Sequence, residues 1–189
     1  MLEIKKISKS IKDKIILNEI SINVNAGEIY GLLGPNGAGK TTTFYMIAGL
    51  LDCKSGVINF LNMDISKLPM HKRSQLGIKY LPQEPSIFQN LSVYENLLGL
   101  AEISFDNKKD IKKFIDKSIE NFDLSEICDL KGRQLSGGQR RKVEIARTLA
   151  DKPKIILLDE PFAGIDPIAI EDIKNVLKQL SNKNIAVLI

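Results

Sequence analysis

The segment GPNGAGKTT lies between an apolar run, residues 29–33, and a stretch of helical character, residues 42–50. The order of strand, glycine-rich loop and helix, with the pattern GxxxxGK followed by Thr, is typical of a loop that binds nucleotide phosphates. Its glycines let backbone N–H groups turn toward the phosphates, and the helix start adds a positive partial charge. The predicted phosphate-binding loop comprises Gly34, Pro35, Asn36, Gly37, Ala38, Gly39, Lys40, Thr41 and Thr42.

Two side chains at the end of this loop have separate expected roles. Lys40 would neutralise β- and γ-phosphate oxygens, and the hydroxyl of Thr41 would be a ligand of Mg²⁺. A glycine-rich turn that carries a lysine by chance is the alternative interpretation. We expect a triphosphate nucleotide with Mg²⁺ as the ligand.

Short β-type runs alternate with helical periodicity in the second half of the chain, which predicts an α/β fold. The run 154–158 contains four consecutive apolar residues without polar alternation, as in a central parallel strand covered on both faces. The predicted strands are 2–7, 20–24, 29–33, 56–60, 77–81, 154–158 and 185–189.

Strand signals are absent from the sequence between residues 84 and 150. There, Ile111, Ile115, Ile119 and Phe122 recur at helical spacing among charged residues, which predicts an amphipathic helix with one buried stripe. We interpret residues 84–150 as a helical insertion in the α/β core.

Two adjacent carboxylates follow the most apolar strand. Asp159 ends the run at the sheet edge where open α/β sheets bind ligands, so its carboxylate can hold a water on Mg²⁺. Glu160 can orient or deprotonate the attacking water in phosphoryl transfer. A plain turn before Pro161 is the alternative, and the phosphate-binding loop argues against it.

Charge and composition exclude several classes of protein. The 27 Lys and Arg residues exceed the 23 Asp and Glu residues by only 4, so we expect no nucleic acid as partner. The two cysteines, Cys53 and Cys128, are far apart and lack metal-ligand spacing, which argues against a zinc site or a disulfide framework. The apolar run 185–189 at the end of the chain leads us to expect a missing C-terminal portion.

The sequence LSGGQ, residues 135–139, resembles the signature of ABC ATPases. Ser136 and the N–H groups of Gly137 and Gly138 would form an anion-binding helix start, with Gln139 in its first turn. In the family this start serves a γ-phosphate held by a second copy of the cassette. A helix cap with a flexible turn is the alternative interpretation of Ser136.

Other family positions match in order along the chain. Gln83 resembles the family's Q-loop glutamine, which contacts Mg²⁺ and the lytic water, and residues 163–166 resemble the D-loop. That resemblance places Asp166 at a dimer interface near the opposite phosphate-binding loop; alone, Asp166 before Pro167 would indicate a helix cap.

The resemblance covers essentially the whole chain and implies an α/β fold with a P-loop NTPase (RecA-like) core, an antiparallel β subdomain and an inserted α-helical subdomain. Residues 1–83 and 151–189 would form the core, and residues 84–150 the helical subdomain with the signature. It further implies an ATP-hydrolysing, head-to-tail homodimer with Mg²⁺. Transmembrane permease subunits would dock near residues 83–88, which would place the protein in the cytoplasm, peripherally on the inner membrane.

Narrower sequence features are similar to the ATPase subunits of lipopolysaccharide exporters. They are LPMHKR at residues 68–73, YLPQEPSIF at 80–88 and DEPFAGIDP at 159–167. We interpret His71, Lys72 and Arg73 as a surface basic cluster or a contact with the partner. Amino-acid importers, soluble ABC ATPases acting on DNA or ribosomes, and a binding-only module are the alternatives.

The sequence departs from the family in two places. Ile11 stands where most members place an aromatic ring against adenine, so aliphatic packing would replace stacking. The family's switch histidine follows the strand that here ends at Ile189, and the only histidine, His71, lies elsewhere. We therefore expect weak hydrolysis by the chain as it stands.

Overall fold

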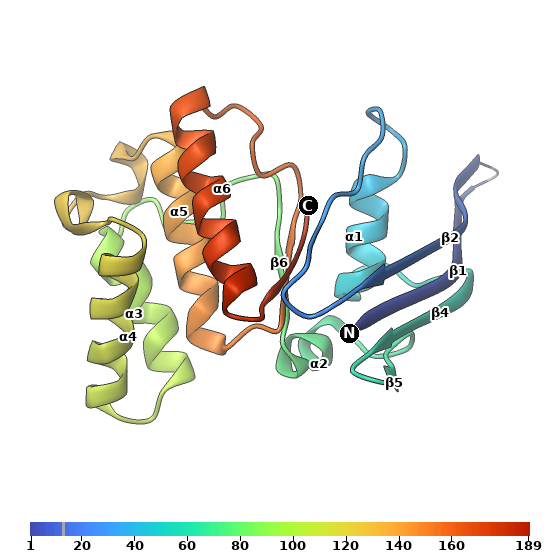
Figure 1. Ribbon diagram of the computed structural model, residues 1–189, viewed down its shortest axis with the longest axis horizontal. Helices are drawn as coiled ribbons and strands as arrows, with labels where there is room; N and C mark the ends of the chain where they lie inside the picture. Colours follow the sequence, from blue (N-terminus) through green and yellow to red (C-terminus); the bar gives the residue numbers. More distant parts are fainter. Residues whose placement is uncertain (13) are drawn as a thin grey trace. The chain divides into compact units, whose positions relative to one another are not determined.

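The apolar runs of the sequence become two four-stranded sheets in the computed structural model, which describes residues 1–12 and 14–189 (Figure 1). By its contacts the chain divides into two units. The first comprises residues 1–80, 154–159 and 180–189, and the second comprises residues 81–153 and 160–179.

One sheet is antiparallel, as the family resemblance implies, with the strand order β2-β1-β4-β5. Ile4 pairs with both Ile22 and Ile58, so apolar residues of three strands lie side by side. The first two strands are longer than the predicted runs 2–7 and 20–24 because polar residues near the turn still pair, for example Ser10 with Ile15. The strands are β1 (Leu2–Ile11), β2 (Lys14–Val24), β4 (Ser55–Phe60) and β5 (Met63–Asp64).

The other sheet has the order β3-β8-β7-β6, and its β3–β8 and β8–β7 pairs are parallel. All four residues of β7 are buried, which confirms the prediction of a central strand. The strands are β3 (Ile29–Tyr30), β8 (Ala186–Leu188), β7 (Ile155–Leu158) and β6 (Ile78–Leu81).

The strand β3 is shorter than the predicted run 29–33. The N–H of Leu32 still donates to the carbonyl of Ile189 at 2.5 Å, but the side chain of Leu33 is 94% exposed. The chain therefore leaves the sheet early to enter the phosphate-binding loop. Apolar character alone overestimates the length of this strand.

A hydrophobic core joins both sheets of the first unit to the helix α1 (Lys40–Ala48). Phe44, Met46 and Ile47 of this helix are buried among residues of β1, β4 and β7. Complete burial of one such side chain stabilises the fold by about 1.5–3 kcal/mol. The helix that follows the phosphate-binding loop is thereby packed against β7, the strand that leads to Asp159.

Arg73 of α2 (Met70–Leu76) corrects the interpretation of a surface basic cluster. His71 and Lys72 are exposed, but Arg73 is only 2% exposed. Its guanidinium donates to the carbonyls of Met46 and Ile47 at the end of α1, at 2.6 and 3.0 Å, and also to those of Ser66 and Leu68. A cation at a helix C-terminus is favoured by the helix dipole, so Arg73 ties α1 to the loop before α2.

We expect Arg73→Met to lower the free energy of unfolding by about 3 kcal/mol, because buried carbonyls lose a charged donor. Urea unfolding followed by circular dichroism measures the change. Lys72→Met, one residue earlier and exposed, is the matched control and should leave stability within about 0.5 kcal/mol. Equal stability of the two variants would contradict the role of Arg73.

The second unit is built from helices, as predicted for the insertion (Figure 1). Ile115 and Phe122 of the predicted stripe are buried, whereas Ile111 and Ile119 are partly buried. Ser92 begins its first helix with a reciprocal capping box to Glu95. Its elements are α3 (Val93–Ser104), α4 (Lys108–Asn121), η1 (Ser125–Ile127), η2 (Gly132–Gln134), α5 (Gly137–Thr148), η3 (Leu149–Asp151) and most of α6 (Pro167–Asn182).

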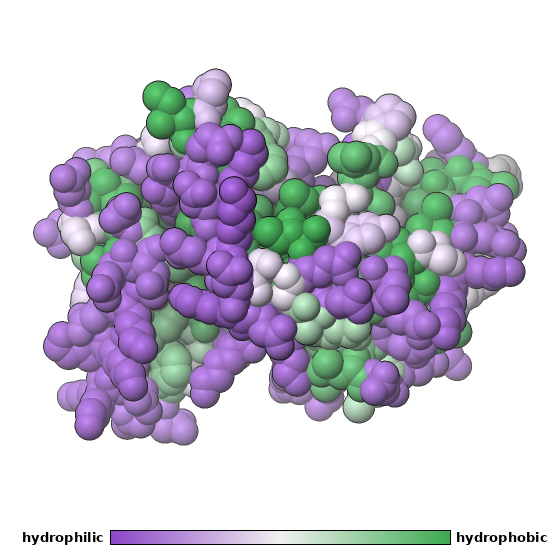
Figure 2. All heavy atoms as spheres, in the orientation of Figure 1, coloured by the Kyte–Doolittle hydropathy of each residue, from purple (hydrophilic) through white to green (hydrophobic). Residues whose placement is uncertain are grey.

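Residues 160–179, which the sequence assigned to the core, lie in this second unit. A Cβ atom at Gly138 would meet the Cβ of Ala169 at 2.4 Å, so α5 and α6 approach closely only because residue 138 is glycine. The side chains of Lys142 and Asp172 form an ion pair at 2.8 Å. The face of α6 seen in Figure 2 is hydrophilic.

No helix in the described part of the chain is long and apolar enough to cross a membrane.

Candidate functional site

The phosphate-binding loop is an exposed turn that glycines make possible. Residues 34–38 are exposed, and Gly37 and Gly39 have φ angles of 83° and 91°. A Cβ at Gly39 would lie 2.5 Å from the Cδ2 atom of Leu17, so both the conformation and the space require glycine there. The loop leads into α1 at Lys40, two residues before the predicted start.

The side chain of Lys40 folds over its own loop. Its Nζ atom donates to the carbonyls of Gly34 and Pro35 at 2.8 and 3.1 Å. A phosphate oxygen is a stronger partner for an ammonium group than a neutral carbonyl, so an incoming phosphate can replace these bonds. Thr41, one residue into α1, is exposed, and the helix start presents its N–H groups there. These residues fit a triphosphate.

Asp159 lies directly after β7 and is 2% exposed. The hydroxyl of Tyr80, on the neighbouring strand β6, donates to its Oδ2 atom at 3.4 Å. Burial, followed by the charge of Asp159, raises the pKa of Tyr80 far above its ordinary value, so the phenol stays protonated and can donate.

The oxygen donors of the first unit fit Mg²⁺. Thr41 offers a hydroxyl and Asp159 a carboxylate, both hard oxygen ligands. Residues 1–12 and 14–189 contain no cluster of three or more His, Cys, Asp or Glu side chains that could hold a metal ion alone. One hydroxyl and one carboxylate suit Mg²⁺, which proteins bind through one or two side chains together with substrate phosphates and water.

Within the second unit, Gln83, Glu160 and Gly137 line one cavity of about 170 Å³ with part of the predicted D-loop. Gln83 and Glu160 are both exposed. Glu160 has a φ of 44°, a left-handed conformation that costs a non-glycine residue about 1–2 kcal/mol. Such conformations concentrate at functional sites, and this one distinguishes Glu160 from the buried Asp159 before it.

The signature residues begin the helix α5. The Oγ atom of Ser136 accepts from the N–H of Gln139 at 3.2 Å, and the side chain of Gln139 accepts from the N–H of Ser136. Ser136 is thus a helix cap, and it is also exposed at a helix start where an anion can bind. The geometry is compatible with both roles considered from the sequence.

Asp166 caps the helix α6. Its Oδ1 atom accepts from the N–H of Ala169 at 2.9 Å, and Pro167 occupies the first helical position. Ser136 and Asp166 do not line the cavity that Gln83 and Glu160 share.

Ile11, at the expected adenine position, is exposed and pairs with Lys14 at the end of the β1–β2 hairpin.

Comparison with known proteins supplies the family. Residues 17–163 match the family model described as ABC transporter, which is most of the chain. The chain belongs to the ABC transporter family. Over its full length it is 53% identical to the lipopolysaccharide export system ATP-binding protein LptB of Haemophilus influenzae and covers 79% of that protein. It is 49% identical over 98% of its length to LptB of Escherichia coli K12, of which it covers 77%.

Solved structures of ABC cassettes have the same fold. The chain superposes with a TM-score of 0.89 on cbiO1 from Clostridium perfringens, part of the transporter complex cbiONQ, at 30% identity, covering 99% of this chain and 76% of that one. The TM-score is 0.84 for a dimeric post-hydrolysis state of the cassette MJ0796 bound to ADP and Pi, at 26% identity. That alignment covers all of this chain and 86% of the other. The expected fold class is therefore confirmed.

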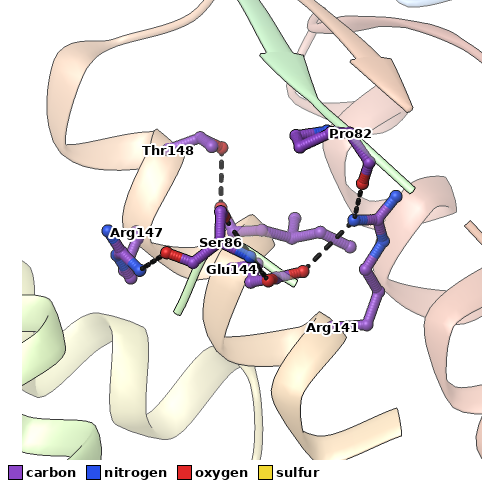
Figure 3. Close-up of polar contacts among 7 residues, drawn as sticks. Pro82, Ser86, Arg141, Glu144, Arg147 and Thr148 are labelled. Carbon is purple, nitrogen blue, oxygen red and sulfur yellow. Dashed lines mark hydrogen bonds and ion pairs between the residues drawn. The ribbon is translucent and has the colours of Figure 1, made fainter. Parts of the chain in front are cut away.

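The structure contains a polar network around Glu144 that the sequence did not lead us to predict (Figure 3). Glu144 of the signature helix accepts from the N–H of Ser86 and forms an ion pair with Arg141 at 3.2 Å. Arg141 also donates to the carbonyl of Pro82 at 3.0 Å, and Arg147 donates to that of Ser86 at 3.0 Å. Spacings of three residues on one helix face were the available signal, since they align these side chains toward one neighbour.

The network holds the segment that follows Gln83 against α5. Phe88, at the end of this segment, is 50% exposed, and the guanidinium carbon of Arg147 lies 4.6 Å from the centre of its ring. An arginine over an aromatic face is a favourable cation–π contact. Phe88 could also have been an ordinary core residue of the helical insertion, but its exposure shows that it is not.

Proposed function

We propose that the chain is the ATP-hydrolysing subunit of an ABC transporter that exports lipopolysaccharide. The observation that carries the proposal is the identity of 53% and 49% to two LptB proteins over essentially the whole chain. The phosphate-binding loop, both carboxylates and the signature are all present in this chain, which supports nucleotide binding and a general base for hydrolysis.

The first unit would bind the nucleotide. The N–H groups of the loop and the start of α1 would surround the β-phosphate, and Lys40 would transfer its bonds from two loop carbonyls to phosphate oxygens. Thr41 and Asp159 would hold Mg²⁺, with Gln83 completing its surroundings when the site closes. When bound, Mg²⁺ neutralises the charge that develops on the phosphates.

The second unit would supply the base. Glu160 is exposed and forms no ion pair in the described part of the chain. Its carboxylate is therefore available to accept a proton from the attacking water. Gln83 lines the same cavity and can orient that water through its amide. The leaving group is ADP, whose charge the phosphate-binding loop retains after the γ-phosphate departs.

Two copies would close head to tail over two ATP molecules. The exposed Ser136 and the N–H groups that begin α5 form a half-site for a phosphate, and they lie in a unit separate from Lys40. A dimeric cassette among the solved relatives supports this assembly. ATP would add contacts across the interface and hydrolysis would remove them. The dimer would then close with ATP and open after hydrolysis, and this movement would be the power stroke of the transporter.

Membrane subunits would receive that stroke through residues 83–88. Phe88 is exposed, and the buried network of Glu144 ties its segment to the signature helix, so the segment and the signature should move as one body. A short helix of a permease subunit suits an exposed aromatic anchor next to a polar backbone. The protein would thus sit peripherally on the cytoplasmic face of the inner membrane.

We expect Phe88→Ala to leave the ATPase activity of the isolated protein unchanged and to weaken its association with membrane subunits. Removal of an aromatic anchor typically costs an interface about 2 kcal/mol or more. Co-purification from detergent extract through a tag on the cassette measures the association. Ile103→Ala, at an apolar residue that is 83% exposed on α3, is the matched control. Normal co-purification of the Phe88 variant would contradict docking there.

The same preparation tests the transported substrate. If the proposal is right, the co-purified complex in proteoliposomes releases lipopolysaccharide to an acceptor only with ATP, and Phe88→Ala abolishes this release. Stimulation by a periplasmic amino-acid receptor instead would favour the importer, and co-purification with nucleic acid would favour a soluble ATPase. Either result would refute lipopolysaccharide export.

A further inference from the structure

A tyrosine hydroxyl contacts the carboxylate that follows β7. Tyr80 is the third residue of β6, a strand adjacent to β7 in the parallel sheet, and its hydroxyl lies 3.4 Å from Oδ2 of Asp159. Both residues belong to the first unit, which also contains the phosphate-binding loop. The distance is at the long end for an O–H···O bond, as is common for catalytic bonds before the substrate binds.

The ring of Tyr80 is held by aromatic residues of α1. Its centroid lies 5.7 Å from that of Tyr45 in an edge-to-face arrangement and 6.4 Å from that of Phe44. Phe44 is buried in the core, and α1 begins at Lys40. The hydroxyl is therefore positioned by the same helix that positions the phosphate-binding loop.

Ring packing accounts for an aromatic residue at position 80 but not for its hydroxyl. A partly buried phenol needs a hydrogen-bond partner, and phenylalanine would fill the same space without one. The hydroxyl adds a neutral donor next to a buried carboxylate. A donor on one oxygen restricts rotation of the carboxylate and fixes the direction of its lone pairs without adding a charge that competes for a cation.

We propose that Tyr80 is a positioning residue for Mg²⁺, because its hydroxyl holds Asp159 in the orientation that the ion requires. The proposal rests on the proposed ATPase function and deepens it at one residue. Tyr80 would touch neither the ion nor the nucleotide, and it would act through Asp159. Strand β6 would in this way contribute a residue to the metal site.

Tyr80→Phe tests the proposal, because it removes the hydroxyl and keeps the ring. We expect the Mg²⁺ concentration for half-maximal binding of a fluorescent ATP analogue to rise roughly tenfold, the usual effect of losing a partner of a metal ligand. Affinity for the same analogue in EDTA should not change, and neither should the melting temperature. The electron paramagnetic resonance spectrum of Mn²⁺ bound with the nucleotide should also change, since it reports the ligand environment directly.

Tyr94→Phe is the matched control, because it removes a phenol hydroxyl from α3 in the other unit. An unchanged Mg²⁺ requirement and Mn²⁺ spectrum in Tyr80→Phe would overturn the proposal. An equal loss of affinity in EDTA would also overturn it, because the hydroxyl would then act on the phosphate-binding loop. Absence of nucleotide binding in the unsubstituted protein would be a different result, which refutes the proposed function itself.

Discussion

Lys40→Ala should lower the affinity for ATP roughly 100-fold or more and abolish turnover, because a charge partner of the phosphates is lost in a desolvated contact. The fold should survive this substitution. The two bonds that Lys40 makes in the structure end on carbonyls of an exposed loop, so their removal costs little stability. Binding of a fluorescent ATP analogue, measured by anisotropy, separates the loss of affinity from unfolding.

Lys67→Ala is the control for Lys40→Ala, because Lys67 is an exposed lysine of the same unit that lies outside the loop. It tests whether one positive charge less on the surface weakens binding in general. Lys40→Arg should also bind poorly, since a planar guanidinium cannot replace the compact ammonium group among loop carbonyls. Retained affinity in Lys40→Ala would contradict the assignment of the phosphate-binding loop.

The conformation of the predicted phosphate-binding loop could be inferred from the sequence because the residues that determine it are neighbours. Gly37 and Gly39 adopt the left-handed conformation that the motif requires, and Lys40 lies at the helix start where the motif places it. The buried strand β7 was equally clear, since four consecutive apolar residues admit few other structures. In both cases, a few neighbouring residues determine the conformation.

Features that depend on packing between distant segments could not be predicted in this way. Arg73 follows an exposed histidine and lysine, and nothing nearby shows that its guanidinium reaches the end of α1. The contact of Tyr80 with Asp159 joins residues 79 positions apart. Glu144 contacts Ser86 across 58 positions, and residues 160–179 belong to the helical unit through the close approach at Gly138. Such pairings need the fold before they can be recognised.

The network of Glu144 shows why a motor would retain buried charges. Arg141 and Glu144 are both nearly fully buried, and a buried ion pair contributes little net stability compared with apolar packing. Both side chains also satisfy backbone groups on either side of Gln83, at Pro82 and Ser86. We expect their benefit to be the fixed register between the segment around Gln83 and the signature helix, which the proposed transmission to membrane subunits would require.

Glu160→Gln should reduce ATP turnover by roughly 10²–10⁴-fold, the usual contribution of a positioned general base. ATP binding should persist, because Lys40 and the rest of the phosphate-binding loop lie in the first unit, whereas Glu160 belongs to the second. Glutamine has the size and shape of glutamate, and a left-handed backbone at residue 160 costs both residues about the same. The loss of turnover would therefore reflect the missing proton acceptor and not a disturbed fold. Release of phosphate in a coupled assay measures it.

The assembly of this variant provides the sharper test. If hydrolysis opens the head-to-tail dimer, then Glu160→Gln with ATP and Mg²⁺ should remain dimeric on a sizing column, whereas the unsubstituted protein should return to monomer. Glu171→Gln, an exposed carboxylate on α6 paired with Lys174, controls for loss of one negative charge. Unchanged turnover would remove Glu160 from the role of base. Slow turnover in a protein that stays monomeric with ATP would keep the base and refute the shared site, because hydrolysis would then need only one copy.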